Sequence, residues 1–186
     1  MDSLQKEKKY TYADYAKWDD DKRYELIGGV AYMMSPAPLR QHQDILVEMV
    51  WQFKSFLKGK PCKVYAAPFD VRLNAAGDTD DTVVQPDIVI VCDKSKLDKK
   101  GCNGAPDMVV EILSPSTVNL DRLIKFNKYL EAGVREYWIV DPETRSVQAC
   151  MRENGKYVVS MYSDADTAPV KVLPGCLIDL KDVFAE

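Results

Sequence analysis

The sequence predicts an α/β fold in which a mixed β-sheet carries helices on its faces. Two runs, Val83–Val91 and Met108–Leu113, are almost continuously apolar, which is typical of strands buried on both sides. Stripes of helical periodicity occur before and after these runs, and the C-terminal part alternates between short strand-like runs and turns. With 186 residues, no internal repeat and no Pro- or Ser-rich linker, residues 1–186 are expected to form one domain.

The N-terminal part predicts a short helix, a hairpin and a long helix. Tyr12–Trp18 has the composition of a short helix, and Arg23–Met34 contains two strand-like runs around Gly28-Gly29, a pair that fits a tight turn. From Leu39 to about Lys58, apolar residues recur at helical spacing until Gly59 ends the pattern. This amphipathic helix is expected to pack on the sheet.

Three strands are expected next, at Cys62–Leu73, Val83–Val91 and Met108–Leu113. The polar segments between them, residues 74–81 and 93–104, are predicted to be surface connections. A second helix is predicted from about Leu120 to Ala132, followed by a strand at Glu136–Val140 and a C-terminal β-meander.

Composition narrows the class of protein. Hydrophobic residues make up 46% and charged residues 29%, as in soluble globular chains, and no apolar run is long enough to span a bilayer. The N-terminus has no apolar stretch of the secretory kind, so the cytosol is the expected location. A net charge of -4 gives no broad attraction to nucleic acid, so any contact with DNA must be local.

Cysteine usage predicts neither disulfides nor a zinc site. The five cysteines are odd in number, widely spaced and without a CxxC pair. We therefore expect reduced thiols at all five positions: Cys62, Cys92, Cys102, Cys150 and Cys176.

Two acidic residues lie inside the apolar runs. A buried carboxylate needs a compensating charge, and both Asp87 and Glu111 are flanked by residues whose burial would normally exclude one. Alternation along two neighbouring strands would aim both carboxylates at one point, and two such oxygens suit a hard divalent cation such as Mg²⁺. Pro86 cannot donate to a sheet ladder, so it marks an edge, a strand start or a bulge, and a bulge would open space beside Asp87.

The second helix carries lysines that a phosphate could reach. At α-helical spacing, three charged residues share one face and three apolar residues share the opposite, packed face. The charged face comprises Asp121, Lys125 and Lys128, and the apolar face Leu123, Phe126 and Leu130.

Two further residues have both a structural and a functional interpretation. His42, the only histidine, falls on the apolar stripe of the first long helix, so it is either a satisfied, partly buried side chain or a site residue. Glu25, in an apolar strand, either lines the metal pocket or forms a salt bridge with Arg23 or Lys22. The sequence has no GxxxxGK[ST], HExxH or GxSxG motif, which excludes nucleotide-driven and zinc-protease chemistry.

As a set, the motifs resemble the Uma two family, an uncharacterised and mostly bacterial group in the PD-(D/E)XK nuclease superfamily. The resemblance spans roughly residues 10–142 and implies a restriction-endonuclease-like fold. The motifs, in chain order, are YELIGG (Tyr24–Gly29), MMSPAP before His42, APFDVRL (Ala67–Leu73), Pro86-Asp87, VVEILSPST around Glu111, DRLIK (Asp121–Lys125) and GVREYWIVDP (Gly133–Pro142).

The resemblance also implies roles for individual residues. In the superfamily, the two motif acids bind metal, and the lysine orients or activates water and stabilises phosphate charge. Carried over to this chain, Asp87 and Glu111 hold Mg²⁺ or Mn²⁺, and both act with Lys125 in catalysis. The supporting candidates are Glu25, His42 and Asp121.

Two positions depart from the superfamily or family pattern. Leu113 stands two residues after Glu111, where the superfamily has its lysine, and the resemblance implies that the lysine has moved to the following helix. Gly28 stands where the family's usual YELIDG has an aspartate.

The function that follows is a metal-dependent endonuclease that hydrolyses phosphodiester bonds in DNA. The alternative is a catalytically silent nuclease-fold domain that acts in nucleic-acid binding or protein assembly, because a fold does not guarantee its commonest activity. DNA is the expected partner, no membrane is involved, and a homodimer is favoured by analogy alone. The enzyme hypothesis requires Asp87, Glu111 and Lys125 to lie together.

Overall fold

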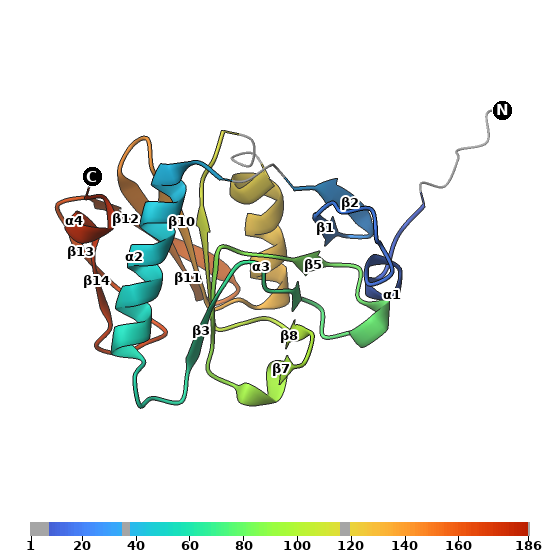
Figure 1. The fold of residues 1–186 in the computed structure, drawn as a ribbon. Helices are drawn as coiled ribbons and strands as arrows, with labels where there is room; N and C mark the ends of the chain where they lie inside the picture. The colour runs from blue at the N-terminus through green and yellow to red at the C-terminus, as the bar shows by residue number, and fades with distance from the viewer. Residues whose placement is uncertain (1–7, 35–37, 116–119, 186) are drawn as a thin grey trace.

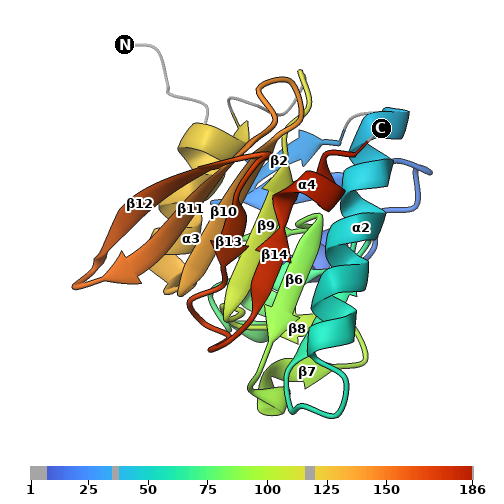
Figure 2. The same cartoon turned by 90° about the vertical axis from the view of Figure 1, so that its left-hand side faces the viewer.

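The computed structural model describes residues 8–34, 38–115 and 120–185, without the side chains of residues 120–122. Its centre is a six-stranded mixed sheet (Figures 1 and 2). In spatial order the strands are β12 (Lys156–Ser163), β11 (Ser146–Glu153), β10 (Glu136–Asp141), β9 (Met108–Ile112), β6 (Ile88–Val91) and β3 (Lys63–Ala66). Only β9 and β10 of this sheet run parallel.

A second sheet of six short strands lies beside the first (Figure 1). Its order is β2 (Val30–Met33), β1 (Tyr24–Ile27), β5 (Val83–Val84), β4 (Val71–Arg72), β8 (Gly101–Asn103) and β7 (Leu97–Asp98). The predicted hairpin is β1–β2, where Gly28 and Gly29 both have positive φ, as a two-residue turn requires. The predicted connection 93–104 thus contains two strands.

The described helices are short except for one. They are α1 (Tyr12–Tyr15), α2 (Arg40–Phe56), α3 (Phe126–Ala132), which a π-helical segment (Leu120–Lys125) precedes, and α4 (Leu180–Val183), with 3-10 turns at Gly77–Thr79 and Lys94–Lys96. None of these helices is both long and apolar enough to cross a bilayer.

Two helices cover opposite faces of the main sheet (Figure 2). On one face, Phe53 of α2 packs in a cluster with Trp138 of β10. On the other, Tyr129 of α3 packs against Tyr137 of the same strand. Because β6 and β9 lie between the two helices, every residue of both strands is buried, as their continuous apolar runs predict.

Two of the predicted strands are each divided between the two sheets. Cys62–Leu73 gives β3 in the main sheet and β4 in the second, and Val83–Val91 gives β5 and β6. Pro86 lies in the second break because it has no N–H for a ladder. The chain therefore crosses between the sheets at Gln85–Asp87, which places Asp87 where both sheets meet.

The C-terminal part is a meander only as far as β12. β10, β11 and β12 are joined as successive antiparallel neighbours, but β13 (Thr167–Pro169) and β14 (Leu177–Asp179) form a separate two-stranded sheet. This small sheet packs beside α2, where Gln52 donates to the Asp179 carbonyl and accepts from the Asp179 N–H.

The prediction that all five cysteines are reduced is wrong. Cys62 and Cys92 form a disulfide, whereas Cys102, Cys150 and Cys176 are free and buried. The reason is the antiparallel pairing of β3 with β6, in which Lys63 faces Val91 and the two flanking cysteines meet. A separation of 30 residues without a local motif does not reveal that register.

Candidate active site

A buried ion-pair network occupies the space between the two sheets. The Lys125 Nζ lies 2.8 Å from the Glu25 Oε1 and 3.0 Å from the Glu111 Oε1. The three side chains are only 4%, 2% and 4% exposed, respectively. Burying an ionised group is costly unless it is paired, so each carboxylate is stabilised by the lysine that they share.

Tyr129 completes this network. Its hydroxyl donates a hydrogen bond to the Glu111 Oε1 at 2.7 Å. Complete burial, and then the negative charge of Glu111, raise the pKa of Tyr129 well above its ordinary value, so the hydroxyl remains protonated and acts as a donor. The sequence analysis missed Tyr129. Its one sequence signal is the i+4 spacing from Lys125, which places both on one side of a helix.

The predicted helix faces are wrong at the start of this helix. Lys125 is buried, whereas Leu123 of the expected packed face is 63% exposed. Lys128 forms its own ion pair with Glu131 and does not share the environment of Lys125. The cause is the π-helical segment, whose wider turn breaks the α-helical spacing on which the prediction rested.

Glu25 is placed by the hairpin and by the crossing between the sheets. It belongs to β1, and its Oε1 also accepts the N–H of Gln85 at 2.9 Å. Of the two interpretations of Glu25, the salt bridge to Arg23 or Lys22 is not formed: Glu25 pairs with Lys125, and Arg23 contacts the Gln85 side chain. Glu25 therefore fixes the position of Lys125 relative to the segment that carries Asp87.

Asp87 lies next to the backbone of Glu111 and is the more open carboxylate. The antiparallel β6–β9 pairing sets Ile88 opposite Val110. Asp87, which immediately precedes β6, therefore lies beside Glu111 near the end of β9. Its Oδ2 accepts the N–H of Ile112 at 2.8 Å and lies 3.2 Å from the His42 Nε2. The Asp87 side chain is 19% exposed, which gives the site access to solvent.

The two motif acids have different neighbours. Asp87 contacts His42 on α2, whereas Glu111 contacts Lys125 and Tyr129 on the α3 side. Sequence alternation put both carboxylates on one face, and the break at Pro86 is the reason that Asp87 reaches toward α2. Within the described ranges, no group of three or more His, Cys, Asp or Glu side chains is arranged to hold a metal ion.

The donor set nevertheless fits a divalent cation. Three carboxylates, on Asp87, Glu25 and Glu111, carry a formal charge of -3, and Lys125 contributes +1, which leaves -2. A hard cation such as Mg²⁺ binds one or two protein carboxylates and completes its shell with water and substrate oxygens. Asp87 and Glu111 can supply those oxygens.

The sequence-derived candidates are thus largely together. Glu25, Glu111 and Lys125 form one contact network, and Asp87 with His42 adjoins it through the peptide after Glu111. The prediction for the Asp121 side chain lies outside the described residues. A second Pro-Asp pair ends at Asp107, which accepts the Cys92 N–H and pairs with Arg135, so it is structural.

A mixed sheet between two helices, with clustered acids and a lysine at one end, defines a restriction-endonuclease-like protein. The chain belongs to the Uma2 family, whose model is described as "Putative restriction endonuclease" and matches residues 12–181.

Two known proteins are similar over most of their length. A crystal structure from Anabaena variabilis, described as "a putative nuclease belonging to DUF820", superposes with a TM-score of 0.74 at 20% identity and covers 94% of this chain and 97% of its own. An uncharacterised protein of Synechocystis is 25% identical over 162 residues, which is 85% of this chain and 83% of that protein.

Proposed function

We propose that this protein is a divalent-metal-dependent endonuclease that hydrolyses phosphodiester bonds in DNA. The observation that carries the proposal is the buried network, in which Lys125 lies between Glu25 and Glu111 beside the more open Asp87. The site's formal charge of -2 supports one divalent ion. The family description and the nuclease-like structural neighbour support the same class of reaction.

In this proposal, Asp87 and Glu111 hold Mg²⁺ or Mn²⁺. When bound, the ion supplies a more acidic water and positive charge beside the phosphate. Asp87 keeps its carboxylate at the rim because the Ile112 N–H and the His42 ring hold its Oδ2. Glu111 keeps a fixed orientation because Lys125 and Tyr129 both bind its Oε1.

Lys125 supplies positive charge in addition to that of the metal ion. An ammonium held in a site with little water stabilises negative charge on phosphoryl oxygens more strongly than it would in bulk solvent. Glu25 prevents Lys125 from swinging out, because its carboxylate pairs with the ammonium and is itself fixed by the Gln85 N–H. Such positioning lowers the reorganisation that the reaction requires.

The test is calorimetric titration of Mn²⁺ together with a plasmid-nicking assay. Asp87→Asn is the site variant, and Asp107→Asn, at the other Pro-Asp pair, is the matched control. The proposal predicts that metal binding and nicking are both lost in Asp87→Asn and are both retained in Asp107→Asn. If the wild-type protein binds no Mn²⁺ and does not nick DNA, it is a silent nuclease-fold domain.

A further inference from the structure

A second concave surface lies at the opposite end of α2 from the candidate active site. It is a groove of about 430 Å³ between the C-terminal half of α2, the following loop and the edge strand β3. His42 is near the start of α2 and Lys58 follows its end, so roughly 25 Å separate the two places at 1.5 Å per residue. The groove is therefore not part of the carboxylate site.

The groove is basic although the chain as a whole is acidic. Residues 51–63 contain four lysines and no acidic residue, whereas the full chain has a net charge of -4. Lys54, Lys58 and Lys63 line the groove, and all three are exposed. The fourth, Lys60, places its ammonium over the Phe56 ring at 3.0 Å. This local concentration of positive charge attracts an anionic ligand.

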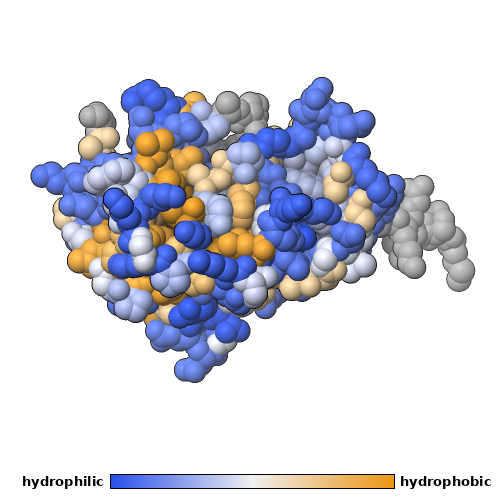
Figure 3. Space-filling model, turned by 60° about the horizontal axis from the view of Figure 1, so that its bottom comes forward, coloured by the Kyte–Doolittle hydropathy of each residue, from blue (hydrophilic) through white to orange (hydrophobic). Residues whose placement is uncertain are grey.

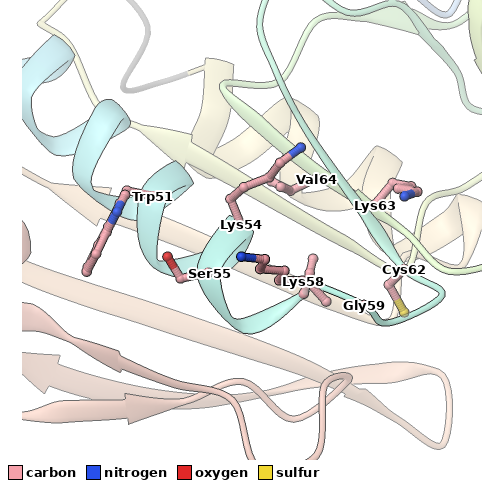
Figure 4. Close-up of a pocket in the computed structure, with 9 residues that line it drawn as sticks. Trp51, Lys54, Ser55, Lys58, Gly59, Cys62, Lys63 and Val64 are labelled. Carbon is pink, nitrogen blue, oxygen red and sulfur yellow. The ribbon is translucent and has the colours of Figure 1, made fainter.

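An exposed tryptophan stands at one end of the same groove. Trp51 is 60% exposed, although tryptophan is highly buried on average. Figure 4 shows Trp51 and Lys54 on α2, Lys58 just after its end, and Lys63 at the start of β3. The space-filling view from below shows hydrophobic patches interrupted by hydrophilic side chains (Figure 3). An aromatic face beside several lysines offers both stacking and charge to one ligand.

The charges decide between the ligands that such a groove could take. A second copy of this chain would bring three more groove lysines against the first three, and Lys63 on an edge strand also discourages strand pairing. An acidic peptide would satisfy the lysines but has no special use for the Trp51 ring. An unpaired nucleotide chain satisfies both, because its phosphates bind lysines and its bases stack on aromatic rings.

We propose that this groove binds single-stranded nucleic acid, with phosphates on Lys54, Lys58 and Lys63 and one base stacked on Trp51. The inference rests on the proposed function for the choice of nucleic acid over other polyanions. It adds to that function a sequence-independent contact at the far end of α2, which would hold an unpaired strand of the substrate while the carboxylate site acts elsewhere on it.

The experiment measures binding of an oligothymidylate by tryptophan fluorescence and anisotropy, in EDTA so that no cleavage occurs. Of the three tryptophans, Trp51 is exposed, Trp138 is fully buried and Trp18 is partly buried in the cluster around Tyr12. The oligonucleotide should therefore quench the emission of the wild type, and most of this quenching should be lost in Trp51→Phe. Lys54→Ala with Lys58→Ala should weaken binding by about tenfold and reduce the salt slope by roughly 1.4, at 0.7 per lost contact. The control pair is Lys156→Ala with Lys181→Ala, both exposed and outside the groove.

The outcomes separate this site from the carboxylate site. Normal Mn²⁺ binding in the groove variants, with weaker oligonucleotide binding, supports the proposal whether or not the protein nicks DNA. Equal affinity in the groove and control variants, or wild-type protein that binds no oligonucleotide, overturns it. A poly-glutamate peptide that binds more tightly than the oligothymidylate also overturns it and assigns the groove to an acidic protein partner.

Discussion

Two buried carboxylates on adjacent parallel strands, Glu111 of β9 and Glu136 of β10, have opposite environments. Glu111 shares the Lys125 ammonium with a second acid, next to the open Asp87. Glu136 accepts its hydrogen bonds from uncharged donors, from Trp138 Nε1 at 2.7 Å and from the Val172 N–H at 2.8 Å, and the nearby charge of Lys171 has a smaller influence on it than burial. Burial raises the pKa of Glu136 above its ordinary value.

The difference separates a structural acid from a candidate catalytic one. Neutral donors satisfy Glu136 in place and tie β10 to the C-terminal segment that contains Val172. Glu111 instead belongs to a cluster with excess negative charge, which a divalent ion would complete. Burial alone does not distinguish the two residues, whereas the kind of partner does.

The largest expected effect is the loss of activity in Glu111→Gln. The substitution removes the negative charge but keeps the size of the side chain, so plasmid nicking should fall by about 10² or more while circular dichroism shows a folded protein. Glu136→Gln is the matched control, and it should nick at the wild-type rate. Equal losses in both variants would mean that buried acids in these strands serve stability alone.

The next effect is on stability, and it follows from the burial of Lys125. Lys125→Ala leaves Glu25 and Glu111 without their shared cation, and breaking a buried ion pair typically costs about 3–5 kcal/mol in the free energy of unfolding. Urea denaturation measures this loss. A triple variant that adds Glu25→Gln and Glu111→Gln should recover most of it, and failure to recover would place the destabilisation in packing.

A smaller loss is expected for Tyr129→Phe. The variant keeps the ring but removes the hydroxyl that donates to Glu111, and a hydrogen bond to a charged group contributes about 1.5–3 kcal/mol. The matched control is Tyr157→Phe, whose hydroxyl donates to the uncharged Val134 carbonyl and should contribute about 1 kcal/mol. Urea midpoints that fall equally in both variants would show that the charge of Glu111 adds nothing.

The fold was predictable wherever one periodicity held over a whole element. The β1–β2 hairpin, α2 and the doubly buried β6 and β9 follow from Gly28-Gly29, an apolar stripe and two apolar runs. The predictions failed where the backbone departs from its regular repeat. The π-helical turn moved Lys125 inward, and the break at Pro86 turned Asp87 toward α2.

Contacts between residues far apart in the sequence were the other feature that sequence patterns did not predict. Motif order alone placed Glu111 and Lys125 in one site, but no local pattern indicates that Glu25 would pair with Lys125, 100 positions along the chain. The Cys62–Cys92 disulfide depends in the same way on strand register. These contacts arise from the meeting of two sheets, which the sequence encodes only through the combined packing of many residues.

The smallest expected effect is the contribution of Glu136 to the pH dependence of protein stability. A carboxyl whose folded pKa is raised binds more protons in the folded state than in the unfolded state between the two pKa values, so stability falls as pH rises through that window. The ordinary pKa of Glu136 is 4.5, so the window begins there and extends upward. The Glu136→Gln variant lacks this titrating carboxyl, whereas its other groups titrate as they do in the wild type.

The melting temperature of the wild type minus that of Glu136→Gln should therefore decrease as pH rises from about 4 toward neutrality. Thermal denaturation followed by circular dichroism at several pH values measures this difference. A difference that grows with pH would mean that the hydrogen bonds from Trp138 and Val172, together with Lys171, outweigh burial and lower the pKa of Glu136. The charged form would then be the preferred one, and the contrast with Glu111 would lie in the ammonium partner alone.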